Sequence, residues 1–161
     1  MKSFYQFSLV VLLVLLFGCQ QPQPQTLTNV ENDAIKKEIK SQFNQLVSAM
    51  NKINVEEWSN FYSKENFVSA IVGTDFYSNR NTFIDSIKYY FSVRQTQNIN
   101  PQFIRVKALT PSLALMTSEE KADIVLKNGQ NNKCKHVFTM IWKKEKEEWK
   151  IIHSHESWID K

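Results

Sequence analysis

Near Asn98 the spacing of apolar residues changes from helical to extended, and this change limits the folds open to the chain. Before Asn98, apolar side chains recur every three or four residues, as on the buried face of an amphipathic helix. After Asn98, turn-forming residues separate long stretches with strand-like patterns. Helices followed by a run of strands are typical of an α+β domain with an antiparallel sheet.

The first half of the pattern predicts three helices and a strand. The first helix is expected over about 32–52, where an apolar stripe begins at Ile35. Asn54 then begins a short second helix, because Glu57 can return to its backbone amide in a capping box. The remaining elements of this half, a strand, a turn and a third helix, are expected at 67–72, 73–75 and 81–95.

The second half predicts four long antiparallel strands. Asn128 and Gly129 are typical of a hairpin, since both tolerate the positive φ of a type I′ turn. The four strands are expected at 103–109, 113–126, 133–144 and 149–159.

Both faces of the predicted 133–144 strand are apolar at its centre. The side chains that point to the two faces are Phe138, Met140 and Trp142, and Val137, Thr139 and Ile141. A sheet with one solvated face should instead alternate apolar and polar residues. We therefore expect the helices to cover one face and a second subunit to cover the other, so that the protein is a homodimer.

The N-terminal segment predicts export and lipidation. Lys2 precedes an almost wholly apolar run over 7–17, which is too short to span a bilayer as a stable helix but fits a signal peptide. Gly18 directly precedes Cys19, and this ending resembles a bacterial lipobox. The resemblance implies a lipid on the Cys19 sulfur and a mature protein anchored in the cell envelope, outside the cytoplasm. An uncleaved apolar anchor and plain secretion are the alternatives.

These boundaries divide the chain into a signal peptide (1–18), a Gln- and Pro-rich tether (19–31) and one folded domain (32–161). With Cys19 lipidated, an internal disulfide is not expected, and Cys134 is interpreted as a small buried hydrophobe. The formal net charge of +4 is modest and the basic residues are scattered, so no nucleic-acid partner is predicted. No metal or cofactor motif is recognised.

Three stretches of the domain resemble the SnoaL-like branch of the nuclear transport factor 2-like superfamily, over about 33–158. The stretches are 71–75, 106–117 and 138–157, and the last contains Trp149, His153, His155 and Ser157. The resemblance implies a curved antiparallel sheet wrapped on three N-terminal helices to form a cone. It also implies a cavity between the concave sheet face and the helices, and dimers through the convex face.

The resemblance further suggests which residues bind a ligand. A relative, the kinase II association domain, has arginines in its cavity, and their positions correspond here to Glu119, Met140 and Glu156. None of these three residues is basic, so an anion site of that kind is not expected. Two cavity carboxylates would favour a cationic or hydrogen-bonding ligand and would have raised pKa values. In the alternative, both are rim residues in water. Trp158 and Tyr62 complete the predicted ligand-binding set.

His153 and His155 lie at alternate positions of the last predicted strand and could bind a metal or exchange protons. A third ligand would be needed, and the sequence places none. Regular alternation along the strand would place both histidines on the same face as Trp149 and Ile151, which favours a packing or interface role. Both interpretations remain open at this stage.

Enzymes of this superfamily often combine an Asp base with a Tyr or Asp hydrogen-bond donor in an apolar site. The residues available for such chemistry are Asp75, Tyr62, Tyr89 and Tyr90. Tyrosines on amphipathic helices more often belong to the core or its rim, so the catalytic residues stay unknown.

We therefore expect a lipid-anchored domain that binds a small molecule or a partner protein through its cavity. The alternatives are a small-molecule acid–base enzyme of the isomerase, dehydratase or cyclase type, and a structural accessory subunit of an envelope complex. Fold alone does not decide among these functions.

Overall fold

In the computed structural model, which describes residues 26–160, the chain enters the fold through the long helix α2 (Asn29–Asn51). The helix begins three residues earlier than expected because Thr28 and Glu31 form a capping box. The Thr28 hydroxyl oxygen accepts the Glu31 amide at 3.2 Å, and the Glu31 carboxylate accepts the Thr28 amide at 2.8 Å. The predicted lipobox and Cys19 lie outside the described residues.

The predicted order of elements is confirmed. The strand expected at 103–109 starts earlier, directly after the third helix, and an additional short strand before that helix was not anticipated. After α2 the elements are α3 (Val55–Ser59), β1 (Ser69–Val72), β2 (Asp75–Tyr77), α4 (Arg80–Val93), β3 (Arg94–Thr110), β4 (Leu113–Leu126), β5 (Asn131–Glu145) and β6 (Glu148–Asp160).

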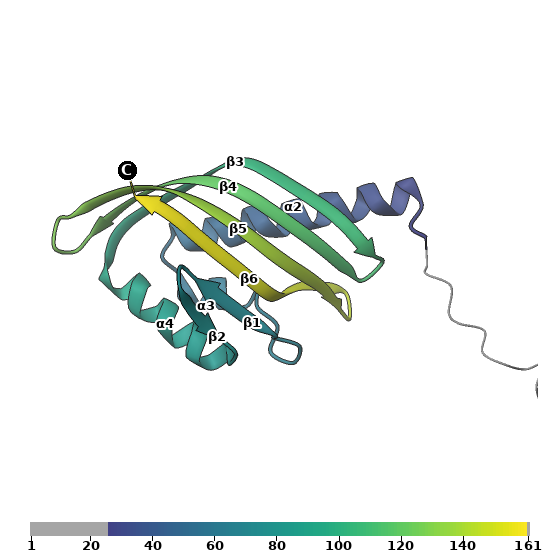
Figure 1. The fold of residues 1–161 in the computed structure, drawn as a ribbon, viewed down its shortest axis with the longest axis horizontal. Coiled ribbons are helices and arrows are strands. Elements are labelled where there is room, and N and C mark those ends of the chain that lie inside the picture. The colour runs from purple at the N-terminus through teal and green to yellow at the C-terminus, as the bar shows by residue number, and fades with distance from the viewer. Residues whose placement is uncertain (1–25, 161) are drawn as a thin grey trace, which may run out of the picture.

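The strands form one six-stranded sheet in the order β2-β1-β6-β5-β4-β3. All neighbours pair antiparallel except β1 and β6, which are parallel. The long strands curve, with α2 running along them and α3 and α4 gathered near the short strands β1 and β2 (Figure 1). This is the α+β architecture that the sequence predicts, with helices on one face of a mostly antiparallel sheet.

The inner face of the sheet packs against the helices to form the core. Ile39, Phe43 and Leu46 of α2 are fully buried, as are Met116 of β4 and Trp142 of β5. The outer face is covered by nothing in the described part of the chain and remains partly exposed, with Val137 43% accessible. No helix within residues 26–160 is long and apolar enough to cross a membrane.

A β-bulge in β6 changes which side chains face inward. Trp142 of β5 pairs with Ile151, but the preceding Ile141 pairs with His153, so Ile152 is an extra residue. Trp149 and Ile151 therefore point inward before the bulge. Ser154 points inward after it and is 3% exposed.

The β4–β5 hairpin forms where expected, but its turn is not type I′. That turn requires positive φ at both central residues. Here only Gly129 has positive φ (87°), and the loop spans the four residues between Leu126 and Asn131. The Leu126 carbonyl accepts the Gly129 amide, and the Leu126 amide donates to the Gln130 carbonyl.

Candidate functional site

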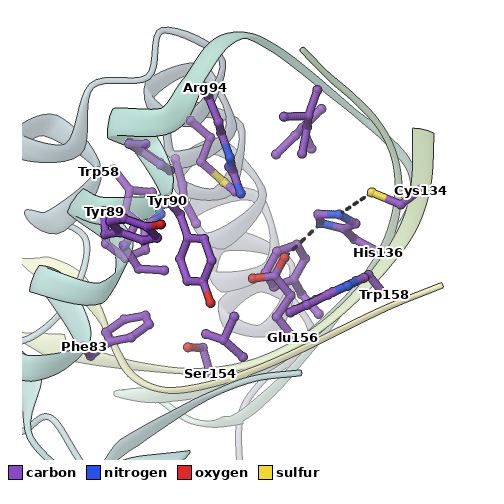
Figure 2. Close-up of a pocket in the computed structure, with 18 of the residues that line it drawn as sticks. Trp58, Phe83, Tyr89, Tyr90, Arg94, Cys134, His136, Ser154, Glu156 and Trp158 are labelled. Carbon is purple, nitrogen blue, oxygen red and sulfur yellow. Dashed lines mark hydrogen bonds and ion pairs between the residues drawn. The ribbon is translucent and has the colours of Figure 1, made fainter. Parts of the chain in front are cut away.

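A cavity of about 340 Å³ lies between the inner face of the sheet and helices α2, α3 and α4 (Figure 2). Most of its wall is apolar and comes from every layer of the fold. The main apolar lining residues are Leu46, Met50, Trp58, Phe83, Ile87, Phe91, Ile99, Ile124, Phe138 and Met140. A wall of this kind favours a ligand with a substantial apolar part.

One wall carries a buried phenol and hydroxyl. Tyr62 follows α3 and is 3% exposed, and its hydroxyl donates to Oγ of Ser154 on β6 at 3.3 Å. Burial raises the pKa of Tyr62 far above its ordinary value, so the phenol stays protonated. Tyr62 can therefore act in this cavity as a hydrogen-bond donor but not as a base.

Arg94 and Tyr90 bring polar groups into the cavity from the α4 side (Figure 2). The Arg94 guanidinium donates to the side-chain oxygen of Gln97 and lies over the Phe91 ring, 5.5 Å from its centroid. Burial lowers the pKa of Arg94, whereas the nearby Glu156 and Cys134 favour the charged form. An arginine keeps its charge at such sites, so the cavity contains a fixed cation.

The opposite wall carries a cysteine, a histidine and a carboxylate in a row. On β5, Sγ of Cys134 lies 2.9 Å from Nε2 of His136. The other ring nitrogen of His136, Nδ1, lies 2.9 Å from Oε1 of Glu156 on β6, at an angle short of a straight hydrogen bond. The three side chains line the cavity, and His136 is 5% exposed (Figure 2).

A second carboxylate, Glu120, is buried beside this row but does not form part of the cavity wall. It pairs with His136 across β4 and β5, is fully buried, and neither of its oxygens has a hydrogen-bond partner among the described residues. Burial raises the pKa of Glu120 to about 7, and Glu156 adds to this, whereas Ser118 and His136 oppose it. Glu120 can thus hold a proton near neutral pH.

Four of the five predicted ligand-binding residues line the cavity, namely Tyr62, Met140, Glu156 and Trp158. The prediction for Glu119 is wrong. Regular alternation along β4 turns Glu119 to the outer face, where its carboxylate lies 2.7 Å from Nζ of Lys135. Its neighbour Glu120 takes the inward position.

The predicted shared face of His153, His155, Trp149 and Ile151 is also wrong, because the β6 bulge separates the two pairs. Both histidines lie on the outer face. Nδ1 of His153 lies 2.8 Å from Oγ of Ser69, and burial and His155 lower its pKa. Within residues 26–160, no group of three or more His, Cys, Asp or Glu side chains could hold a metal ion.

The suggested acid–base residues are only partly brought together. Tyr89 and Tyr90 line the cavity together with Tyr62, but Asp75 is exposed on β2 and does not line it. Sequence reasoning missed Arg94, which falls where the third helix was expected to continue. It also missed the Cys134–His136 pair, although their spacing of two residues on one strand places them on the same face.

Comparison with known proteins identifies the fold independently. Residues 39–161 match the family model described as a SnoaL-like domain. Among curated proteins, none matches the chain significantly in sequence.

Several solved structures share the architecture. A nuclear transport factor 2-like superfamily protein from Salmonella enterica serovar Typhimurium has a TM-score of 0.71 at 15% identity, covering 78% of this chain and 91% of that one. A candidate scytalone dehydratase from Novosphingobium aromaticivorans has a TM-score of 0.75 at 10% identity, covering 82% and 89%. The association domain of CaMKII from C. elegans has a TM-score of 0.66 at 15% identity, covering 80% and 99%. At these identities, the likeness establishes the fold alone.

Proposed function

Because the chain belongs to the SnoaL-like domain family, of the nuclear transport factor 2-like superfamily, we propose that it binds a small, largely apolar molecule in the cavity under its sheet. The observation that carries the proposal is the cavity itself. Its volume of about 340 Å³ falls within the range of small-molecule sites, and an apolar wall with few polar groups is their usual composition.

The polar groups indicate what the ligand should carry. Glu119 lies outside the cavity, so the pair of cavity carboxylates that favoured a cationic ligand does not form. Arg94 instead brings a cation close to Glu156, and Tyr90 adds a hydroxyl group. This combination favours a neutral molecule with a carbonyl or hydroxyl oxygen at one end.

Calorimetric titration with 2-naphthol, an aromatic molecule with one hydroxyl group, tests the proposal. Val93 lines the cavity, whereas its neighbour Ser92 is exposed and does not. Val93→Trp should fill part of the cavity and weaken binding about ten-fold or more, and the control Ser92→Trp should bind like wild type. No binding to wild type, or equal binding to both variants, would contradict the proposal.

A second candidate function is acid–base catalysis on the bound molecule, which the His136–Glu156 contact favours. A histidine next to a carboxylate in a largely apolar cavity can remove a proton next to a carbonyl group. The test is exchange of the α-protons of cyclohexanone with deuterated water, followed by NMR. His136→Gln should slow this exchange about 100-fold, whereas Ser92→Ala, at an exposed position outside the cavity, should leave it unchanged. Exchange at the uncatalysed rate in wild type would remove this candidate.

We also propose that the domain is held at the cell envelope by a lipid on Cys19 and pairs with a second copy through its outer sheet face. The apolar run before Cys19 and the partly exposed apolar side chains on that face support these two proposals. A structural accessory role in an envelope complex would be favoured if the cavity bound no small molecule.

A further inference from the structure

We propose that Cys134 is a nucleophile that adds to α,β-unsaturated carbonyl compounds bound in the cavity, with His136 as its base and Glu156 as a positioning residue. The inference rests on the proposed binding function and deepens it, because it names a class of ligand and a covalent step. It starts from the row of three side chains that line one wall of the cavity (Figure 2).

The geometry matches the arrangement that activates a thiol. A carboxylate beside one ring nitrogen of a histidine favours the tautomer with its proton on that nitrogen. With the proton on Nδ1 facing Glu156, 2.9 Å away, Nε2 presents its lone pair to the Cys134 thiol, also 2.9 Å away. His136 can then take the thiol proton, and Glu156 stabilises the imidazolium that results.

The cavity supports the charge that forms on sulfur. Arg94 lies close enough to Cys134 and Glu156 for both to favour its charged form. A nearby cation and a histidine are the features that distinguish reactive cysteines from inert buried ones. Cys134 is 8% exposed and lines the cavity, so a molecule bound there can reach the sulfur.

The position of Cys134 argues for conjugate addition rather than acyl transfer. Acyl transfer develops a negative oxygen next to the sulfur and needs free backbone donors there. Cys134 lies within β5 and pairs with Ala122 on one side and Asp160 on the other. Its backbone therefore belongs to the hydrogen-bonded sheet and does not offer free N–H donors next to the sulfur. Conjugate addition develops the negative oxygen several atoms away, where Arg94 or Tyr90 can donate to it.

The step balances without an oxidant or a leaving group. The thiol proton passes to Nε2 of His136, and the sulfur forms a bond with the β-carbon of the ligand. The electron pair of the carbon–carbon double bond moves toward the carbonyl oxygen to give an enolate. His136 then returns the proton to the α-carbon, and the product is a saturated thioether on Cys134.

The test treats the full-length chain with 2-cyclohexen-1-one and locates the adduct by tandem mass spectrometry. One probe molecule should add at Cys134, about ten-fold or more faster than to N-acetylcysteine at the same pH. Saturated cyclohexanone should add nothing. His136→Gln should reduce the rate to that of N-acetylcysteine, and Glu156→Gln should slow it and move its pH profile. Reaction at Cys134 no faster than at N-acetylcysteine would overturn the proposal.

Two further measurements separate a failure of the nucleophile from a failure of folding or of ligand binding. If His136→Gln does not fold, the wild-type pH profile decides, because a rate that follows an ordinary thiol pKa near 8.5 contradicts activation by His136. Cyclohexanone binding to Cys134→Ser separates the two proposals. Binding without an adduct in wild type overturns the nucleophile alone, whereas no binding and no adduct overturn the binding function as well.

Discussion

Among single residues, Glu120 is a buried carboxylate that costs folding free energy when it is charged. Its carboxylate is fully buried, and neither oxygen has a hydrogen-bond partner among residues 26–160. Desolvation disfavours the charged form of such a group, so the folded protein keeps it protonated up to a pKa of about 7. The unfolded chain loses that proton near its ordinary value of 4.5.

The stability of the protein should therefore depend on pH through Glu120. Between the unfolded and folded pKa values, the folded state holds one more proton, so stability falls as pH rises through this window and the cost is constant above it. Glu120→Met, which removes the charge at similar volume, should stabilise the protein at about pH 8 by roughly 3 kcal/mol at most, and by much less near about pH 4. Denaturant unfolding at the two pH values measures the difference.

The neighbouring Glu119 provides the control for this prediction. It lies on the outer face in an exposed ion pair with Lys135, so Glu119→Met should change stability by less than about 1 kcal/mol at either pH. Equal effects of the two substitutions would show that Glu120 is hydrated in solution.

The sequence alone does not determine which of Glu119 and Glu120 points into the fold. Two adjacent glutamates on a predicted strand must point to opposite faces, but the pattern does not say which one points inward. In the structure, Ala114, Met116 and Ser118 of β4 are buried on the inner face. Alternation along the strand then places Glu120 on that face and Glu119 on the outer one. The cavity positions of Met140, Glu156 and Trp158 could be inferred, since the resemblance covered those strands.

At the scale of elements, the turn between β1 and β2 controls one side of the cavity. Gly73 has a φ of 62°, and a Cβ atom there would lie 2.8 Å from the Trp158 ring. Trp158 lines the cavity from β6, which passes next to β1. Because Gly73 has no side chain, the indole ring of Trp158 can pack directly against the turn.

Gly73→Ala should destabilise the fold and displace Trp158. The left-handed backbone costs about 1 to 2 kcal/mol with a Cβ atom, and the contact with the indole ring adds to this. Gly129→Ala is the control, because Gly129 also has positive φ but nothing lies within 4 Å of its added Cβ. Thermal unfolding and tryptophan fluorescence should both change in Gly73→Ala, and only unfolding in Gly129→Ala. An unchanged spectrum in Gly73→Ala would contradict the contact.

The elements themselves could largely be predicted, because hydrophobic period and capping residues are local properties. Asn54 begins α3 as an N-cap, because its side-chain oxygen accepts the Glu57 amide at 3.0 Å. The expected return contact does not form, since the Asn54 backbone amide donates to the Ala49 carbonyl instead of to Glu57. The β6 bulge could not be predicted, since an extra residue such as Ile152 leaves no local mark in an apolar strand. That one residue placed His153 on the outer face, away from Trp149, so the expected shared face was wrong while an interface role on the outer face stays a prediction.

At the scale of the whole molecule, the outer sheet face should mediate assembly. Near the centre of β5, Val137 on this face is exposed and Ile141 is half-buried. A monomer would be expected to present polar residues there. We predict a dimer of the full chain. Ile141→Glu should convert it to a monomer, because a charge buried without a partner at an interface is costly. Light scattering at micromolar concentration measures the mass, and a monomeric wild type would contradict the prediction.

We propose that a residue outside the described part of the chain, Cys19, sets the position of the domain in the cell. We predict that Cys19→Ala abolishes membrane association, because several acyl chains on one cysteine provide the anchor. Fractionation after a high-salt wash, with Cys134→Ser as the control, measures the effect. Cys19→Ala protein that still sediments with membranes like wild type would show that the anchor is not a lipid on this residue.

We propose that the cavity under the sheet is the binding site, and nuclear Overhauser contacts with bound 2-naphthol would locate the ligand. Ile87 of α4 and Ile124 of β4 line the cavity, whereas Val137 of β5 lies on the outer face. We expect contacts between the naphthol ring protons and the methyl groups of Ile87 and Ile124. Contacts with Val137 alone, or none with either isoleucine, would contradict this proposal.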